Sequence, residues 1–513
     1  HDRGIISEVL HSAKTGAGTI VQPIFPSAIL IDKSTGQRWF GIEADRRFGQ
    51  VGPGKGHVFV TSLKTRLRDY AEGRRTSGAG DEVGSDPTSF DIADLFRSFL
   101  QALAESIRRS QSLGPDESLE VVVTWPANAN GAQRYITRKC FREAGFRVID
   151  TLNEPTASAI ELADCLTAGR AGRQSPGPNA LAVFDLGGGT FDASVVKVDG
   201  EDFHVLASAG IERLGGDDFD NVLLDMFLKA MRVSPESLGG MTRHALLRHA
   251  RAQKETISAG VMKSLFLNPR DFGLQGALVT IPVEAFFERV RPLIRPAIKL
   301  LKEIIEQAGR KEPRLQSGSP LTVYLVGGSS KLPLVAEMVS HAFPAERVIL
   351  TDKPFMSVAM GAAICATQHV SYRDVFARHF GLIRLKDHGR VETFDTIFPA
   401  GTPVPRRGEP PLERTTWYHP KHNIGHLRYL ECTSVGPDGL PAAGVRAWSD
   451  IRFPYDPAIP LAAPVSSEPI VSTDQYAGDP VCEVYRCDCD GVITVELRRP
   501  ACKDARTYEV GRD

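Results

Sequence analysis

The chain has 513 residues, enough for more than one hydrophobic core, so we expect several domains. Its 61 basic and 62 acidic residues leave a formal net charge of -1, which argues against nucleic-acid binding driven by bulk charge. No apolar run is long enough to span a bilayer and no signal peptide opens the chain, so we expect a cytoplasmic protein without membrane contact.

Strand and helix patterns alternate through the first 370 residues. Extended segments are predicted at residues 29–32 and 38–42, and a helical apolar pattern follows between residues 92 and 107. Further strands are expected at residues 119–124, 148–150, 181–185, 191–198, 203–209 and 322–326. Further helices are expected near residues 132–144, from 155, near 218–262, near 284–308 and from 332. This alternation places residues 1–370 in the α/β class.

Beyond about residue 370 the character of the sequence changes. Prolines and turn residues become frequent and strand signals such as residues 492–497 dominate, so we predict a second, β-rich domain from near residue 380. Five of the eight cysteines fall here: Cys432, Cys482, Cys487, Cys489 and Cys502. They contain no C-x-x-C pair, so reduced thiols are favoured over a zinc site, which stays an alternative.

The strongest local signal is the segment FDLGGGTFD, residues 184–192. Three consecutive glycines follow a buried strand: Gly187, Gly188 and Gly189. Glycines let backbone amides approach an anion closely, and the chain then re-enters a strand, so we predict a β-hairpin phosphate cradle. Asp185 and Asp192 suit a hydrated magnesium ion, and Thr190 can offer a hydroxyl to a terminal phosphate or to an attacking water. A glycine-rich turn with solvated acids is the structural alternative.

Two later glycine pairs repeat this pattern. Each follows a β segment and precedes a helix, where free amides can meet a phosphate. The first comprises Gly215, Gly216 and Asp217, and the second comprises Gly327, Gly328 and Ser329. Three such turns in order within one α/β region indicate a nucleotide site better than any one of them alone.

These segments resemble, in family order, the nucleotide-binding domain of the 70-kilodalton heat-shock (DnaK-type) chaperones, within the actin-like ATPase superfamily. The likeness is carried by VVVTWPANANGAQR (121–134), LNEPTASAI (152–160), FDLGGGTFDASVV (184–196), LGGDDFDN (214–221), KETIS (254–258) and LVGGSSKLP (325–333). It spans most of residues 20–370. The resemblance implies a two-lobed domain of ribonuclease H-like subdomains that binds ATP or ADP with Mg2+.

The resemblance also implies roles for single residues. Glu154 and Asp185 would hold magnesium through water, Asp192 would orient the lytic water, and Thr190 would contact the γ-phosphate. Lys64, in SLKTRL, would neutralise charge during phosphoryl transfer. The nucleotide contacts would be Gly187, Gly188, Gly189, Thr190, Gly215, Gly216, Asp217, Lys254, Ser258, Gly327, Gly328, Ser329 and Lys331. Taken alone, Lys64, Lys254 and Ser258 also fit ordinary solvated helix positions, and Glu154 fits a carboxylate that favours a helix N-terminus.

Several positions depart from the family pattern. No first phosphate loop of the Asp-Leu-Gly-Thr type occurs in residues 1–30, so we interpret the chain as an N-terminally truncated member with impaired hydrolysis. Arg251 stands where an acidic ribose contact is expected, and Phe355 lies near an expected acidic adenosine contact. HVSYRDVFARHF, residues 369–380, replaces the leucine-rich interdomain linker of the family.

The C-terminal region resembles the family's substrate-binding β-sandwich more faintly. FDTIFPAGTPVP (394–405) is similar to its start, and CDCDGVITVELRR (487–499) to its late hairpin, with Asp490-Gly491 as the turn. We therefore predict a nucleotide-binding domain at 1–370, a linker at 371–388, and a short β-rich domain without a helical lid at 389–513.

Together these features predict an ATP-binding, chaperone-like protein that couples Mg-ATP hydrolysis to the binding of unfolded or extended polypeptides, with co-chaperones as further partners. The alternative is a catalytically degenerate, nucleotide-dependent binding scaffold, which the first-loop departure, Arg251 and Phe355 favour. A sugar kinase on the same fold lacks an identifiable acceptor-site base. A filament-forming actin relative is disfavoured by the C-terminal β-rich region.

Overall fold

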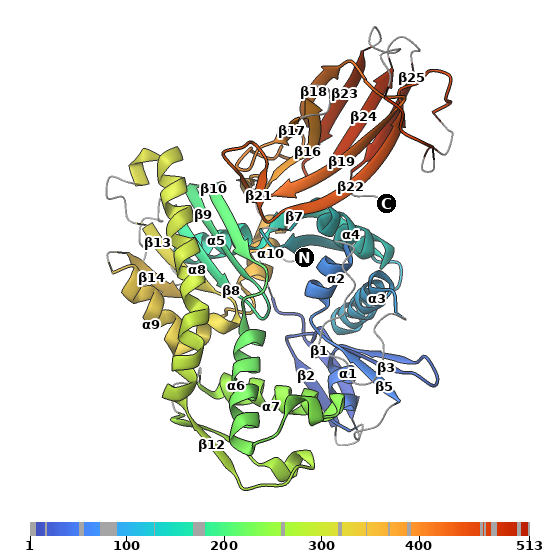
Figure 1. Cartoon of the computed structure of the whole chain (residues 1–513). Coiled ribbons are helices and arrows are strands. Elements are labelled where there is room, and N and C mark those ends of the chain that lie inside the picture. The colour runs from blue at the N-terminus through green and yellow to red at the C-terminus, as the bar shows by residue number, and fades with distance from the viewer. Residues whose placement is uncertain are drawn as a thin grey trace. The chain divides into compact units, whose positions relative to one another are not determined.

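The computed structural model describes residues 7–15, 18–50, 56–71, 90–127, 129–167, 180–257, 262–315, 321–344, 346–367, 370–386, 391–461, 465, 468–472, 480–499 and 504–510. The chain divides into two compact units. The first comprises His1–Ala127 and Arg138–Ser371, and the second comprises Asn128–Thr137 and Tyr372–Asp513. Figure 1 labels their elements. In the parts described, no helix is long and apolar enough to cross a membrane.

The central sheet of the first unit is built from buried apolar strands. β8 (Ala180–Leu186), β9 (Phe191–Asp199) and β10 (Asp202–Ile211) form an antiparallel meander, and β13 (Leu321–Val326) and β14 (Arg347–Leu350) extend it in parallel beyond β8. Every residue of β8 and β13 is buried, as expected for strands covered on both faces. Val326 pairs with Asp185, so the turns that follow β13 and β8 lie at the same end of the sheet.

Helices contact this sheet through apolar stripes. α8 (Val283–Lys311) packs against β9 and β10, and α5 (Glu154–Thr167) packs against β8 and β9. α8 buries Phe286, Val290 and Ile294 at helical spacing in the same core as Phe184 and Phe191. α9 (Pro333–Ala342) and α10 (Ser357–Thr367) follow β13 and β14, respectively. This arrangement of strands and helices agrees with the predicted α/β class.

The remaining elements of the first unit form smaller sheets. β3 (Ile29–Asp32) pairs with β4 (Arg38–Phe40) and β5 (His57–Val60), and β6 (Leu119–Trp125) pairs in parallel with β7 (Phe146–Asn153). The hairpins are β1 (His11–Thr15) with β2 (Gly18–Gln22), and β11 (Ser264–Leu267) with β12 (Val279–Pro282). The helices are α1 (Gly41–Phe48), α2 (Leu63–Ala71), α3 (Ile92–Gln111) and α4 (Gly131–Glu143). Residues 131–137 of α4 belong to the second unit.

One predicted helix is in fact two. The apolar pattern predicted a helix near residues 218–262, but the structure has α6 (Gly216–Met231) and α7 (Gly240–Ile257). α6 ends at Arg232, which adopts a left-handed conformation, and a short 3-10 turn over Pro235–Ser237 follows. Proline at residue 235 cannot donate to a helical ladder, so the chain turns here despite the continuing apolar pattern.

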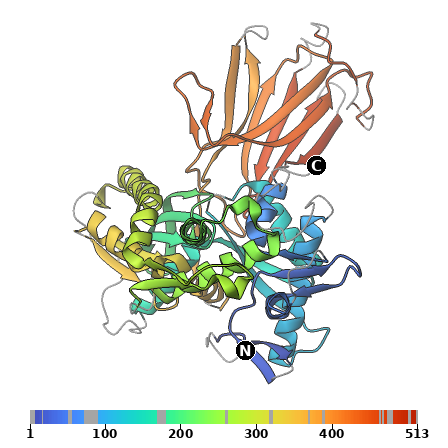
Figure 2. The same cartoon turned by 60° about the horizontal axis from the view of Figure 1, so that its bottom comes forward.

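The second unit is a β-sandwich of two four-stranded antiparallel sheets. One has the order β17 (Val391–Phe398), β16 (His379–Lys386), β19 (Ile424–Cys432) and β22 (Arg446–Pro454). The other has the order β18 (Leu412–Tyr418), β23 (Val481–Cys487), β24 (Ile493–Arg499) and β25 (Asp504–Glu509). β24 alternates buried and half-buried residues, as a strand with one face on a core requires. Figure 2 shows these strands from another side.

Two details of this unit differ from the sequence interpretation. The segment predicted as a linker, 371–388, contains β16, an inner strand of the sandwich. The hairpin expected to turn at Asp490-Gly491 pairs Cys487 with Ile493, so a five-residue loop joins β23 and β24. Asp488 accepts hydrogen bonds from two backbone N–H groups inside this loop, and Gly491 takes a φ of +74°. The connection is therefore a five-residue loop held by the Asp488 carboxylate, and not a two-residue turn.

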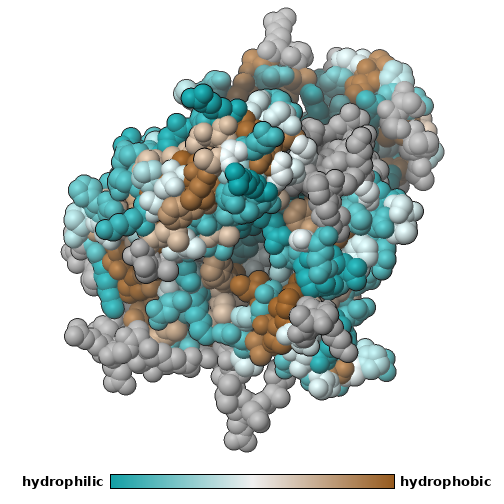
Figure 3. Space-filling model, turned by 90° about the horizontal axis from the view of Figure 1, so that it is seen from below, coloured by the Kyte–Doolittle hydropathy of each residue, from teal (hydrophilic) through white to brown (hydrophobic). Residues whose placement is uncertain are grey.

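The surface of the first unit mixes polar and apolar residues. Large hydrophobic side chains are exposed on several elements, including Leu278 in the segment before β12 and the adjacent Ile20 and Val21 on β2. Figure 3 shows hydrophobic residues on the face seen from below as separate patches among hydrophilic ones. Scattered exposed hydrophobics of this kind are normal on a soluble protein surface.

Candidate functional site

The glycine-rich turn between β8 and β9 forms the centre of the candidate site. Asp185 and Asp192 are opposite each other in the β8–β9 ladder, and both are buried. The Gly187 N–H donates to the Thr190 carbonyl at 3.0 Å and closes the turn. The sequence therefore predicted correctly that two carboxylates flank a tight glycine turn, because the strands on either side continue in register.

The two other glycine segments contact this turn. At the N-terminus of α6, the Gly216 N–H donates to the Gly187 carbonyl at 3.0 Å, and the Asp217 N–H donates to the Gly188 carbonyl at 2.7 Å. In the turn after β13, the Ser329 hydroxyl also donates to the Gly187 carbonyl, at 2.7 Å. Three segments separated by up to about 140 residues thus form one cluster, which we call the glycine cradle (residues 187–190, 215–217 and 327–329).

Close backbone approach explains why glycine is needed in the cradle. A Cβ atom on Gly215 would lie 2.5 Å from the Gly188 carbonyl oxygen. A Cβ atom on Gly327 would lie 2.4 Å from the Leu186 carbonyl oxygen, and its φ of +81° also disfavours other residues. The Asp218 carboxylate accepts the Gly215 N–H at 2.8 Å and so closes the first turn of α6. The cradle is therefore a packed backbone structure whose shape depends on its glycines.

Charged side chains gather beside the β8–β9 turn. Lys64, in the first turn of α2, forms an ion pair with Glu154, the first residue of α5. Burial, together with the negative charges of Glu154 and Asp192, raises the pKa of Asp185 to about 8, whereas the charge of Lys64 opposes the shift. Desolvation acts to lower the pKa of Lys64, but Glu154 raises it on balance. Three carboxylates lie close to a single lysine, so a further cation would reduce the repulsion between their negative charges.

Lys254 and Ser258 are two of the predicted adenosine contacts, and only Lys254 lies within the described residues. The Lys254 ammonium is buried, donates to the Gly216 carbonyl at 2.9 Å, and pairs with Asp220 at 2.6 Å. It thus joins α7 to the start of α6. Ser258 lies outside the described residues, just beyond the end of α7 at Ile257. A contact of either side chain with adenosine stays a prediction.

Lys331 and Phe355 lie next to Gly328, in the third segment of the cradle. The Lys331 ammonium lies over the Phe355 ring, 5.2 Å from its centroid, and the ring itself is 59% exposed. A Cβ on Gly328 would lie 2.2 Å from this ring, so Gly328 leaves room for it. An exposed aromatic face beside a cation can stack on a flat heterocyclic ring.

Sequence reasoning missed three residues of this site. Ser62 donates its hydroxyl to Asp217 at 3.3 Å from the turn between β5 and α2, and it takes a left-handed φ of 54°. Thr65, in the first turn of α2, lies next to Gly189, whose Cβ would be 3.3 Å from its hydroxyl. Asp220 is fully buried and binds both Arg251 and Lys254. Only Asp220 had a signal in the sequence, as a third acid in LGGDDFDN; the other two depend on tertiary contacts.

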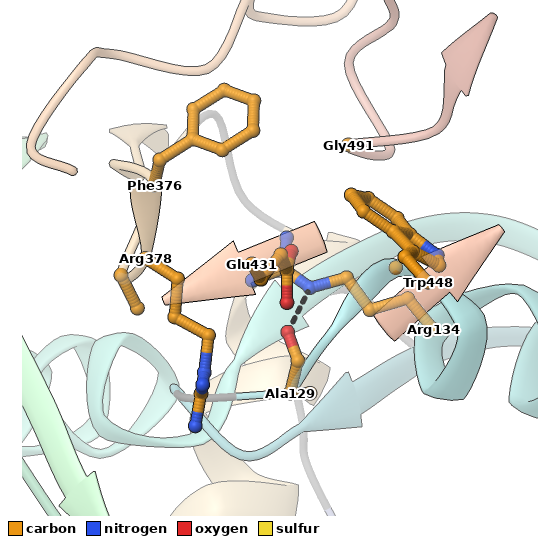
Figure 4. Close-up of a pocket in the computed structure, with 9 residues that line it drawn as sticks. Ala129, Arg134, Phe376, Arg378, Glu431, Trp448 and Gly491 are labelled. Atoms are coloured by element: carbon orange, nitrogen blue, oxygen red, sulfur yellow. Dashed lines mark hydrogen bonds between the residues drawn. The ribbon is translucent and has the colours of Figure 1, made fainter. Parts of the chain in front are cut away.

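A second, small pocket lies within the β-sandwich unit. Its volume is about 20 Å³, room for roughly one water molecule, and it is lined by Arg134, Arg378, Glu431, Trp448 and neighbouring residues. Figure 4 shows Glu431 between the two arginines, with Arg134 bonded to the Ala129 carbonyl. Burial raises the pKa of Glu431 to about 7, although Arg378 and Arg134 oppose the shift. Its size excludes a nucleotide.

The described cysteines of this unit are not grouped as metal ligands. Cys432, Cys482 and Cys487 are buried, and Cys502 lies outside the described residues. Over the described ranges, no group of three or more His, Cys, Asp or Glu side chains is arranged to hold a metal ion directly. The same holds for the carboxylates beside the cradle, so a metal there would have to be bound largely through water.

The segment that contains the glycine cradle matches a known protein family. A family model described as "Hsp70 protein" matches residues 85–377, more than half of the chain. The chain belongs to the Hsp70 family. The matched segment contains the whole glycine cradle together with Glu154, Asp185 and Asp192, whereas Lys64 lies before it. The family assignment made from the motifs is therefore confirmed.

Curated relatives of this Hsp70 family member agree. Chaperone protein HscA of Cronobacter sakazakii is 36% identical over 267 residues, which are 52% of this chain and 39% of that protein. Chaperone protein HscA of Escherichia coli O7:K1 is 37% identical over 246 residues, or 48% of this chain and 36% of that protein. A Chaperone protein HscA homolog of Burkholderia lata is 34% identical over 262 residues, or 50% and 39%. The match spans under two fifths of the length of these relatives.

Proposed function

We propose that this chain binds ATP and ADP in the glycine cradle and couples that binding to a chaperone function. The observation that carries the proposal is the convergence of three glycine segments on the β8–β9 turn, with Lys64, Glu154 and Asp185 beside it. Family membership and relatives named as chaperones support the same function. The predicted nucleotide-binding domain at 1–370 is part of this proposal, and so is the β-rich domain, which includes β16 as well as the predicted residues 389–513.

The residues beside the cradle fit hydrated magnesium. Asp185 and Glu154 offer carboxylate oxygens, the donors that magnesium prefers, and the surplus of negative charge around Asp185 would be relieved by a divalent cation. Bound magnesium would neutralise charge on the phosphates during transfer. Asp185 and Glu154 would hold it through water, and deprotonation of Asp185 would accompany binding.

Hydrolysis would transfer the γ-phosphoryl group of ATP to water and release ADP, phosphate and a proton. Asp192 would orient the attacking water, and Thr190 would hold the γ-phosphate through its hydroxyl, since both lie at the mouth of the β8–β9 turn. Lys64, half-exposed and paired with Glu154, would counter the charge that develops on the phosphate oxygens.

The sandwich would bind unfolded or extended polypeptide clients, with co-chaperones as further partners. β17, β22, β18 and β25 lie at the edges of its two sheets, and an edge strand has free backbone groups that an extended peptide can pair with. Trp417 on β18 is 57% exposed and would offer an apolar contact next to such a peptide. We propose a cytoplasmic location for this function.

A nucleotide-dependent binding scaffold without turnover is the second candidate. It is favoured by Arg251 and Lys254, which already use their charges on Asp217, Asp220 and the Gly216 carbonyl. Such a protein would bind nucleotide and would not hydrolyse it.

Calorimetric titration with Mg-ADP and Mg-ATP, followed by single-turnover hydrolysis, separates these candidates. We expect binding of both nucleotides and hydrolysis that falls about 100-fold or more in Lys64→Ala, because the transition-state charge loses its counter-charge. Lys299→Ala, a surface lysine on α8, serves as the matched control and should leave the rate unchanged. Binding without any turnover supports the scaffold, and absence of binding contradicts both.

A further inference from the structure

A carboxylate lies next to the glycines that a phosphate would have to approach. Asp217 is the second residue of α6 and donates its N–H to the Gly188 carbonyl at 2.7 Å. A Cβ on Gly189 would lie 3.6 Å from one Asp217 carboxylate oxygen, and a Cβ on Gly188 would lie 3.9 Å from the other. An anionic ligand in the glycine cradle would therefore meet a negative charge at close range.

Arg251 compensates this charge from the neighbouring helix. Its Nη2 atom is 2.5 Å from Asp217 Oδ1, and its Nε atom is 2.9 Å from Asp220 Oδ2. One guanidinium group on α7 thus binds two carboxylates on α6, one of them fully buried. The Arg251 side chain itself is 47% exposed, so it keeps an open side toward solvent and an entering ligand.

The second oxygen of Asp217 is held as well. Ser62 donates its hydroxyl to Oδ2 at 3.3 Å from the turn before α2. Lys254 forms an ion pair with Asp220 and donates to the Gly216 carbonyl. Among the contacts of the described residues, Arg251 places its cation directly on the carboxylate beside the phosphate-binding glycines.

We propose that Arg251 is a positioning residue of the phosphate site: it holds and neutralises Asp217 so that the glycine cradle accepts the phosphate chain of a nucleoside di- or triphosphate. This inference rests on the proposed nucleotide binding and adds a residue that makes the site selective for phosphorylated ligands over the nucleoside. Without the guanidinium group, the Asp217 carboxylate would repel the phosphates. A nucleoside, which has no phosphate, would be insensitive to this change.

The test compares ADP with adenosine. Arg251→Gln keeps hydrogen-bonding capacity at this position but removes the charge, and Asp217→Asn removes the repelling charge. By isothermal titration calorimetry at fixed magnesium and salt, we expect Arg251→Gln to weaken ADP binding about 10-fold or more and adenosine binding less than about 2-fold. Adding Asp217→Asn to the Arg251→Gln chain should restore ADP affinity to within about 3-fold of the unaltered chain, as coupled residues require.

Arg248→Gln is the matched control. Arg248 lies on the same helix one turn earlier and pairs with Asp45, so its loss changes the charge of α7 without touching Asp217. It should leave the ratio of ADP to adenosine affinity unchanged. A circular-dichroism melt of each variant shows whether α6 and α7 stay folded.

Three outcomes contradict the proposal. Arg251→Gln with unchanged ADP affinity shows that the charge on Asp217 does not matter. Equal losses for ADP and adenosine without rescue by Asp217→Asn show that Arg251 only clamps α6 to α7. If the unaltered chain does not bind ADP, the proposed function itself fails. That result is distinct from the other two because it is seen without any variant.

Discussion

The glycine cradle and the β-sandwich core both bury carboxylates, but they surround them differently. In the sandwich, Glu483 is fully buried and accepts hydrogen bonds from Arg384 at 2.5 Å and from the Tyr485 hydroxyl at 2.6 Å. Beside the cradle, Asp185 is equally well buried, yet its pKa is raised to about 8 by burial and by the two nearby acids Glu154 and Asp192. Like charges gathered without full compensation are typical of a ligand site, whereas a paired and bonded carboxylate is typical of a structural one.

Two buried carboxylates within the sandwich unit, Glu483 and Glu431, show the same contrast between a bonded and an incompletely bonded acid. Arg384 joins Glu483 on one sheet to Asp395 on the other, and Arg414 also binds Asp395. Glu431, in the small pocket, has one carboxylate oxygen that accepts no hydrogen bond from the described residues. The Arg384–Glu483 pair thus joins the two sheets, whereas Glu431 leaves one of its carboxylate oxygens without a hydrogen bond from the described residues.

The largest expected effect follows from breaking the sandwich pair. Glu483→Gln removes the fully buried partner of Arg384 and leaves Asp395 as its described carboxylate partner, so we expect the free energy of unfolding of the sandwich to fall by up to about 3–5 kcal/mol. Urea denaturation followed by near-ultraviolet circular dichroism of its tyrosines measures this. The double variant Arg384→Met/Glu483→Leu removes both charges and should recover most of the loss. A drop below about 1 kcal/mol would place Glu483 with the ligand-site carboxylates instead.

Glu431 should make the sandwich stability depend on pH. Its folded-state pKa of about 7 is above the ordinary value of 4.5, so the folded state holds a proton more tightly than the unfolded state. Stability is then full below pH 4.5 and falls by about 3 kcal/mol as the pH rises to 7, an order-of-magnitude value for a buried group. Glu431→Gln should remove this slope. Urea midpoints measured from pH 4.5 to 8 give it directly, and parallel slopes in both proteins would refute the assignment.

The smallest effect is expected at the cradle. At pH 7, Asp185 with a pKa of about 8 is already mostly protonated in the nucleotide-free protein, so Asp185→Asn should change the free energy of unfolding by less than about 1 kcal/mol. It should nevertheless weaken Mg-ADP binding strongly. Thermal denaturation combined with calorimetric titration tests both parts. A loss of stability as large as that of Glu483→Gln would show that Asp185 is structural.

Much of the site was predictable because its signal is local. Gly187, Gly188 and Gly189 between two apolar strands leave few alternatives to a hairpin turn flanked by Asp185 and Asp192. The alternation of strands and helices likewise gave the α/β class and the β-rich end. These inferences depend on spacing within ten residues, which the sequence displays directly.

The rest could not be predicted because it depends on contacts between distant segments. Arg251 meets Asp217 across 34 positions, and Ser62 meets the same carboxylate across 155. The pairing of Lys254 with the buried Asp220 likewise depends on how α6 packs on α7, and its contact with adenosine stays a prediction. The break between these helices was also missed, since apolar residues continue at helical spacing through the turn.

Amide hydrogen exchange with and without Mg-ADP tests the central claim most directly. Nucleotide bound in the glycine cradle should protect residues 187–190, 215–217 and 327–331 together, because the three segments form one site, and should leave β23 and β24 of the sandwich core unchanged. Protection of all three segments at the same ADP concentration is the predicted result. Exchange that stays unchanged in the cradle, or protection of a single segment alone, would contradict the account.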